Sequence, residues 1–147
     1  MKKSNQYIVF NLDRWRYGLH LSYVARVVRV VEITPLPKAP EIVLGVVNVH
    51  GEIIPVFNIR HRLRLPEREI ELSDKLIIAR TSKQTVALLV NAVSGVIEPS
   101  EEDIVTPENI MPSVKYSEGV VKLEGGLILL IHDLDKFISF ETEDMLD

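Results

Sequence analysis

The sequence predicts an all-β protein built from two similar β units, and three observations support this. Short runs of β-branched and other apolar residues recur along the chain between turn residues, as is typical of barrels and sandwiches. The stretch Gly45–Arg60, GVVNVHGEIIPVFNIR, is the clearest hairpin, because Val46–Val49 and Ile53–Phe57 flank Gly51, a residue suited to the positive φ of a tight turn. The third observation is that a similar hairpin sequence recurs later in the chain.

Two shifts align the first part of the chain with the second. A shift of 74 residues places Gly119–Asp133 over Gly45–Ile59, and a shift of 69 residues places Leu76–Ile97 over Tyr7–Val28. Positions that stay identical are Gly45, Val46, Val47, Gly51 and Ile54 with Gly119, Val120, Val121, Gly125 and Ile128, and Ile8, Leu19, Val24 and Val27 with Ile77, Leu88, Val93 and Val96. We therefore expect one domain over residues 1–147, made of two pseudo-repeated β subdomains.

The first unit begins with a predicted hairpin of Tyr7–Leu12 and Trp15–Leu21. Ser22 is a candidate N-cap for a single helical turn over Tyr23–Arg26. A valine-rich strand follows. The stretch Thr34–Pro40 contains three prolines, so it is predicted to be an extended connection rather than a helix.

After the central hairpin, Asn58 is a candidate cap for a short helix that ends near Leu63 or Leu65, before Pro66. Pro55 cannot donate to a β ladder, so its strand should lack a partner on one side there. The remaining predicted strands are Lys75–Arg80, Thr85–Val90, Val93–Ile97, Val120–Leu123 and Leu127–Ile131. Ser100 is a candidate cap for a turn through Asp103, and Asp133 is a candidate cap for a helix over Leu134–Phe140.

Composition limits the class of protein. With 147 residues, of which 46% are hydrophobic and 26% charged, the chain resembles one soluble globular domain. Its apolar runs are far shorter than the ~18 residues of a membrane span, so we expect no direct membrane insertion. The absence of cysteine excludes disulfides, thiol nucleophiles and thiolate zinc sites. The polar N-terminus lacks the apolar core of a secretory signal, and a cytoplasmic location is the simplest interpretation.

Charge is distributed unevenly along the chain. Residues 1–74 carry a net charge of +3 and residues 75–147 carry −7. If these halves correspond to the two units, ends of opposite sign would favour head-to-tail contacts with the same protein or with a relative. The simpler explanation is that acidic surface residues and the tail Glu141–Asp147 maintain solubility.

No cluster of reactive residues predicts an enzyme. The four histidines are scattered, and the chain lacks a phosphate-binding loop, a GxSxG elbow and a GxGxxG fingerprint. His132 lies beside Asp133 and Asp135 where a strand runs into a helix, and capping and solvation explain this group better than a metal site or a catalytic base. We expect no catalytic residue, no metal and no cofactor.

One basic cluster could suggest nucleic-acid binding, and it contains Arg60, His61, Arg62, Arg64 and Arg68. The whole chain is acidic, however, aromatic residues make up 6%, and glutamates follow the cluster at once. We interpret the cluster as a solvated helix face with local ion pairs, and we expect no nucleic-acid partner.

The valine-rich strand Val24–Val31 is the first of three binding candidates. Val27 and Val28 are adjacent and must point to opposite faces, whereas an ordinary core strand needs only one apolar face. Part of this strand should therefore lie between the two units or face a partner.

The other two candidates lie on a hairpin and a loop. Asn48 is best explained as a structural amide, whereas His50 at the turn should be accessible to a ligand. Ile110 and Met111 stand in a proline-bounded loop that suits either protein contact or packing against the domain.

The stretch Gly45–Arg60 resembles the signature of CheW-type chemotaxis coupling proteins, whose hairpin typically reads GVINLRG followed by IIPVVDLR. The similarity extends through Ile33–Pro40, Lys75–Ile97 and Leu127–Phe137, so it covers nearly the whole chain. CheA kinases carry a similar regulatory domain. Because this sequence shows nothing before or after that domain, we expect a stand-alone adaptor.

The resemblance implies a fold of two five-stranded, SH3-like β-barrels packed side by side with short helices. It also implies a function: a non-catalytic adaptor that couples the cytoplasmic tip of chemoreceptors to the CheA histidine kinase, within receptor arrays at the inner face of the membrane. In the family, the receptor's helical hairpin docks in a groove between the barrels, as helix-in-groove recognition requires. Kinase contacts at the barrel ends join subunits head to tail, which implies self-association in rings.

The resemblance also implies two sets of site residues. The receptor-binding groove would be lined by Val24, Val27, Val28, Asn48, His50, Val93 and Val96. The kinase-binding surface, which would meet the CheA regulatory domain, would contain Glu108, Asn109 and Ile110.

Two positions depart from the family pattern. His50 stands where arginine is usual, and Asn58 stands where aspartate is common. Histidine is smaller than arginine and can be neutral at pH 7, so receptor choice or coupling strength should differ from that of typical members.

Two alternatives compete with the adaptor: a small-ligand regulatory module that uses the inter-barrel groove, and a nucleic-acid binder built on SH3-like barrels. The missing phosphate-binding loops and the acidic balance disfavour both.

Overall fold

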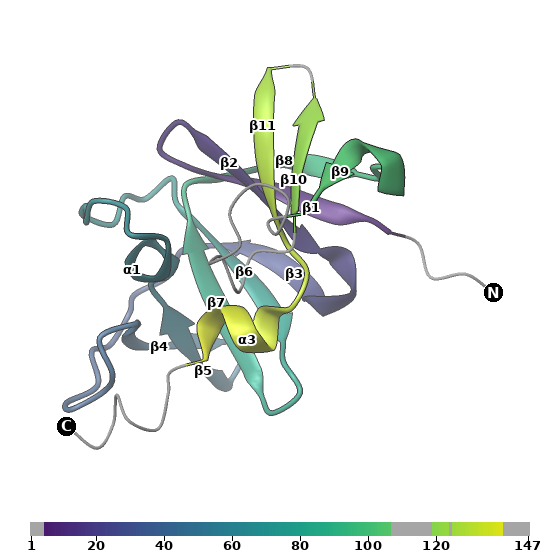
Figure 1. Ribbon diagram of the computed structural model, residues 1–147. Coiled ribbons are helices and arrows are strands. Elements are labelled where there is room, and N and C mark those ends of the chain that lie inside the picture. The colour runs from purple at the N-terminus through teal and green to yellow at the C-terminus, as the bar shows by residue number, and fades with distance from the viewer. Residues whose placement is uncertain (1–4, 107–118, 124, 140–147) are drawn as a thin grey trace.

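The computed structural model describes residues 5–106, 119–123 and 125–139, and their strands form two sheets (Figure 1). Sheet A has the strand order β8 (Ala92–Ile97), β1 (Tyr7–Leu12), β2 (Trp15–His20), β11 (Gly126–Ile131), β10 (Gly119–Leu123) and β9 (Ile104–Val105). Sheet B has the order β3 (Val24–Arg29), β6 (Lys75–Arg80), β7 (Thr85–Val90), β5 (Glu52–Phe57) and β4 (Val43–Val49).

The central hairpin, β4 with β5, is confirmed, and its turn explains two of its residues. Val49 pairs with Glu52, which leaves His50 and Gly51 as a two-residue loop with φ angles of 51° and 88°. Two consecutive positive φ values are typical of a type I′ turn, whose backbone twist matches that of the flanking strands. Pro55 also behaves as predicted, because the ladder from β5 to β7 contains only Val56 and Phe57.

Three of the four predicted caps are confirmed. Asn58 accepts a hydrogen bond from the backbone N–H of Arg60 and begins α1 (Ile59–Leu63). Asp133 accepts from the N–H of Lys136 and begins α3 (Leu134–Ile138), which ends two residues earlier than predicted. Ser100 and Asp103 form a capping box around the 3₁₀ turn η2 (Glu101–Asp103).

The predicted cap at Ser22 is wrong. The 3₁₀ turn η1 spans Leu21–Tyr23, and the Nδ1 atom of His20 accepts the hydrogen bond from the N–H of Ser22. The chain is already extended at Val24, where β3 begins, because β-branched residues fit a strand better than a helix.

The segments matched by the sequence shifts occupy equivalent places in the two sheets. Under the shift of 69 residues, β1, β2 and β3 correspond to β6, β7 and β8; under the shift of 74, β4 and β5 correspond to β10 and β11. Replacing each strand of sheet B by its counterpart gives β8-β1-β2-β11-β10, which is the order found in sheet A. Even the bridge between Thr34 and Val46 has a counterpart, in the pairing of Val105 with Val120.

The two units exchange strands, so they do not correspond to the two halves of the sequence. Unit B, built on sheet B, is the continuous segment 24–90, whereas unit A, built on sheet A, combines the first strands with the last ones. Segment 24–90 carries 10 Lys and Arg and 7 Asp and Glu, and the rest of the chain carries 7 and 14. The charge contrast expected for the halves therefore applies to the units.

Among the described residues, three apolar clusters hold the structure together. One lies inside unit A, around Tyr7, Val9 and Ile128, and another lies inside unit B, around Val47, Ile54 and Leu76. The largest cluster, called the seam core here, lies between the sheets, and its buried residues are Ile8, Phe10, Leu12, Tyr17, Leu19, Ile42, Phe57, Ile59, Ile77, Ala79, Val86, Leu88, Val90, Ile131, Leu134, Phe137 and Ile138. Each sheet thus buries both faces over much of its area.

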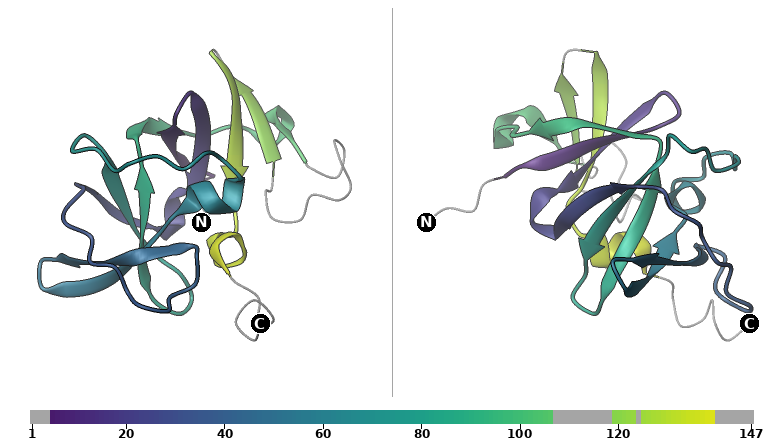
Figure 2. Two further views of the ribbon diagram at one scale, coloured as in Figure 1. Left: turned by 90° about the vertical axis from the view of Figure 1, so that its left-hand side faces the viewer. Right: turned by 180° about the vertical axis from the view of Figure 1, so that it is seen from behind.

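The fold class is confirmed as all-β, with two SH3-like units and short helices. The helices α1 and α3 follow equivalent strands and lie side by side across the seam (Figure 2). Among the described residues, no helix has both the length and the apolar content needed to cross a membrane.

Candidate interaction site at the seam between the units

The middle of the seam is closed by the protein's own side chains. Phe10, Leu19 and Leu88 are fully buried there, so core side chains fill the middle of the groove that was expected between the barrels. Two apolar sheet faces placed next to each other bury their side chains against one another, which is the most stable use of those faces. A partner can reach only the rim of the seam.

Four of the predicted groove residues form this rim. Val24 and Val27 on β3, and Val93 on β8, are partly buried against the seam core. Val96, also on β8, is 49% exposed. Because β3 and β8 are edge strands of different sheets and equivalent under the repeat, the rim joins one apolar edge from each unit.

Val28 points away from this rim. It packs against the interior cluster of unit B, whereas its neighbour Val27 packs against the seam core. The prediction that these adjacent valines face opposite sides is therefore confirmed, and Val28 does not join the four rim valines.

Asn48 and His50 lie elsewhere in unit B. Both are exposed, on β4 and its turn, and β4 is the opposite edge strand of sheet B from β3. The Asn48 side-chain oxygen accepts a hydrogen bond of 2.8 Å from the backbone N–H of Gly51, so this amide stabilises the hairpin turn. The accessibility predicted for His50 is confirmed.

The predicted kinase-binding residues Glu108, Asn109 and Ile110 lie outside the described residues, as does Met111.

Arg60 corrects the interpretation of the basic cluster as a solvated helix face. Its side chain is 8% exposed, and its guanidinium donates two hydrogen bonds to the carboxylate of Asp13, at 2.8 and 2.9 Å, with further bonds to Asn91 and the carbonyl of Pro66. Arg68 does form the predicted local ion pairs, with Glu71 and Asp74. Arg60 therefore ties α1 to the β1–β2 turn of the other unit.

The ion pair between Arg60 and Asp13 shifts the pKa of the aspartate. The hydrogen bonds from Arg60 lower the pKa of Asp13; partial desolvation opposes the shift, and the charges of Arg60 and Arg68 add to it. Sequence reasoning missed the pair because its members are 47 residues apart and no local pattern connects them.

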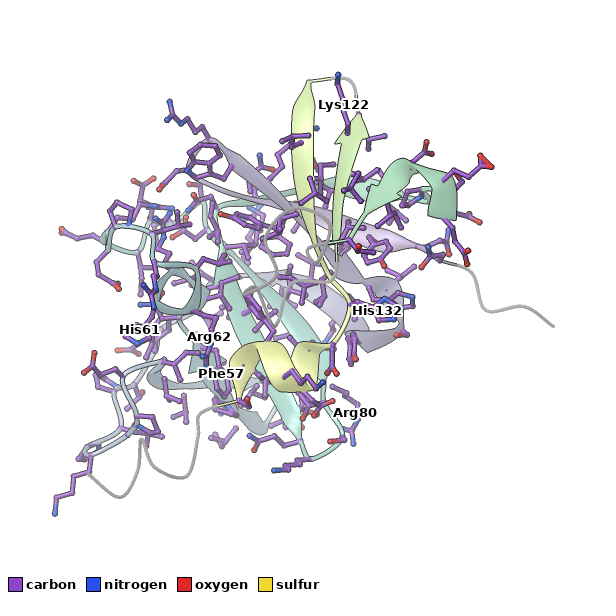
Figure 3. The ribbon with its side chains drawn as sticks, in the orientation of Figure 1. Phe57, His61, Arg62, Arg80, Lys122 and His132 are labelled. Atoms are coloured by element: carbon purple, nitrogen blue, oxygen red, sulfur yellow. The ribbon has the colours of Figure 1, made fainter. Side chains whose placement is uncertain are left out.

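In the group at His132, Asp133 and Asp135, the predicted capping role is confirmed for Asp133, and the other two side chains make contacts that were not predicted. Asp133 caps α3, and His132, beside the start of α3 in Figure 3, shares a hydrogen bond of 3.1 Å with the hydroxyl of Tyr7. Asp135 accepts hydrogen bonds from the backbone N–H and the hydroxyl of Ser82, which ties the β6–β7 turn to α3. Within the described part of the chain, no three His, Cys, Asp or Glu side chains are grouped to hold a metal.

Comparisons with known proteins agree with this fold. Residues 6–141 match the family model of the CheW-like domain. The chemotaxis protein CheW of Thermotoga maritima is 32% identical, over 93% of this chain and 89% of that protein, and CheW of Treponema pallidum is 29% identical, over 91% and 82%. The crystal structure of the scaffolding protein TtCheW from Thermoanaerobacter tengcongensis aligns with a TM-score of 0.76 and 32% identity, over 88% of this chain and 89% of that one. On these grounds the chain belongs to the CheW-like family of chemotaxis coupling proteins.

Proposed function

We propose that this protein is a non-catalytic adaptor that joins the cytoplasmic tip of a chemoreceptor to the regulatory domain of the CheA histidine kinase, in arrays at the inner face of the membrane. Membership of the CheW-like family and the likeness to a chemotaxis scaffold support this proposal. The receptor binds at the rim of the seam, and the kinase binds at the surface that contains Glu108, Asn109 and Ile110.

The observation that carries the proposal is the rim formed by β3 and β8. Val24 and Val27 of unit B and Val93 of unit A pack against the seam core from the edge strands, and Val96 is exposed on β8. A helix that presents apolar residues three and four positions apart can bury them against apolar edges of this kind.

Substitution on the rim tests the receptor site. Val96→Asp places a carboxylate on an exposed part of β8, so we expect an intact fold and at least a tenfold weaker affinity for a receptor-tip helical hairpin, measured by calorimetry. Leu72→Asp is the matched control, because Leu72 is 94% exposed on a loop of unit B. Unchanged affinity in Val96→Asp, with its fold verified by circular dichroism, would show that the receptor does not bind at the rim.

Val27→Asp tests the same rim from the other unit. Val27 is partly buried, and we expect weaker receptor binding with the native fold retained. If the variant instead unfolds, Val27 is a core residue and its assignment to the receptor site fails.

A further inference from the structure

One face of sheet A continues past the area that unit B covers. Tyr17 on β2 pairs with Leu129 on β11, and both side chains pack against the seam core. Side chains two positions apart on a strand share a face, so Trp15 and Leu127 lie on that same face, one step further out. Their exposed fractions are 48% and 62%.

Strand register extends this surface over two more strands. Lys122 on β10 pairs with Leu127, Val120 pairs with Leu129, and Val105 on β9 pairs with Val120. Lys122 lies at the end of the β10–β11 hairpin furthest from α3 (Figure 3). The surface, called the outer strip here, consists of Trp15, Leu127, Lys122, Leu129, Val120 and Val105.

Unit B shows that the fold does not require this strip. The repeat places Gln84, Ile53, Asn48, Pro55, Val46 and Thr34 at the equivalent positions. Among them, only Ile53 is a large hydrophobic residue with high exposure, at 61%. Trp15 and Val105, which is 46% exposed, therefore add apolar surface where unit B has Gln84 and Thr34.

The outer strip has charges of opposite sign at its two ends. At the β2 end, the guanidinium of Arg14 lies 4.7 Å from the centre of the Trp15 ring. At the other end, η2 leads into β9 and exposes Glu101 and Glu102. If two strips meet face to face and run in opposite directions, each basic end faces the acidic end of the other strip.

We propose that the outer strip binds the outer strip of a second copy of this chain, in a two-fold symmetric dimer with the strips antiparallel. A self-complementary patch is what such symmetry requires, because the same residues contact each other from both sides. The strip is small, so the dissociation constant should be on the order of 10–100 µM, as for weak interfaces. This dimer does not depend on the receptor site proposed above.

Sedimentation equilibrium of the full-length protein between roughly 1 µM and 1 mM, with tryptophan emission recorded in parallel, tests the contact. Trp15 is the only tryptophan, so its emission should shift to the blue as dimer forms. Leu127→Asp should stay monomeric, and Ile53→Asp, the repeat-equivalent change, should dimerise like the wild type. A wild type that is monomeric throughout, or equal loss of dimer in both variants, would overturn the proposal.

Charge reversal tests the antiparallel arrangement. Arg14→Glu alone and Glu102→Arg alone should each weaken the dimer about tenfold, and the double variant should recover most of that loss. Failure of the double variant to recover would overturn the two-fold geometry. Growth of the wild type beyond a dimer would do the same, because it indicates a head-to-tail contact.

Discussion

The two units touch through equivalent contacts that use different chemistry. In unit A, the β1–β2 turn supplies the carboxylate of Asp13 to Arg60 at the start of α1. In unit B, the β6–β7 turn supplies the hydroxyl and N–H of Ser82 to Asp135 on α3. Asp13 and Ser82 are equivalent under the 69-residue shift. The repeat has thus kept the place of each turn–helix contact but not its residues.

The same contrast appears between core and surface. Leu19 and Leu88, equivalent under the repeat, are both fully buried in the seam core. Trp15 and Gln84, also equivalent, give the two units different surfaces. Burial in one shared core constrains both copies alike, whereas exposed positions are under no such packing constraint.

The largest effect should come from the seam core. Leu19→Ala and Leu88→Ala each remove a fully buried side chain, and we expect each to lower the free energy of unfolding by about 3 kcal/mol. Because one shared core joins the units, urea unfolding followed by circular dichroism should show a single transition in both variants. Two separate transitions, or losses that differ by more than about 2 kcal/mol, would break the equivalence.

The turn–helix contacts should be unequal. Arg60→Ala removes a buried guanidinium together with its two hydrogen bonds to the Asp13 carboxylate, so we expect a loss of about 2 kcal/mol in the free energy of unfolding. Ser82→Ala removes one exposed hydroxyl and should cost about 0.5 kcal/mol. Denaturation of both variants under one condition measures the difference, and equal losses would contradict the ranking.

Acid should separate the two contacts further. The folded-state pKa of Asp13 is lowered, mainly by its hydrogen bonds from Arg60, so its contribution is complete above the unfolded-state pKa of about 3.9 and is lost as pH falls through the folded value. The stability difference between wild type and Asp13→Asn should therefore shrink from pH 5 to pH 2. Thermal unfolding across that range checks this, and a constant difference would exclude Asp13 as the titrating group.

The smallest effect should come from the hairpin turn of unit B. His50 is exposed, so His50→Arg should leave stability unchanged. Because it lies at the opposite edge of sheet B from the rim, the change in affinity for the protein's own receptor tip should be at most about twofold. Calorimetry at several pH values between 6 and 8 measures it. A change of tenfold or more across that range would show that the receptor also contacts this turn.

Local patterns in the sequence were enough to predict most elements and the caps at Asn58, Ser100 and Asp133. They were not enough to predict the exchange of strands between units, because the partners of β3 and β8 lie far away in the chain. The filled seam and the Arg60–Asp13 pair were missed for the same reason. At Ser22 the error was local, since the following valines favoured a strand over a helical turn.

Simultaneous binding tests the adaptor most directly. A receptor-tip hairpin and the CheA regulatory domain, added together to the full-length protein, should form a complex containing all three, detected by light scattering after size-exclusion chromatography. Val96→Asp should lose the receptor and keep the kinase domain, because the proposal assigns these partners to separate surfaces. Mutual displacement of the two partners on the wild type, or loss of both in Val96→Asp, would contradict an adaptor that holds two proteins at once.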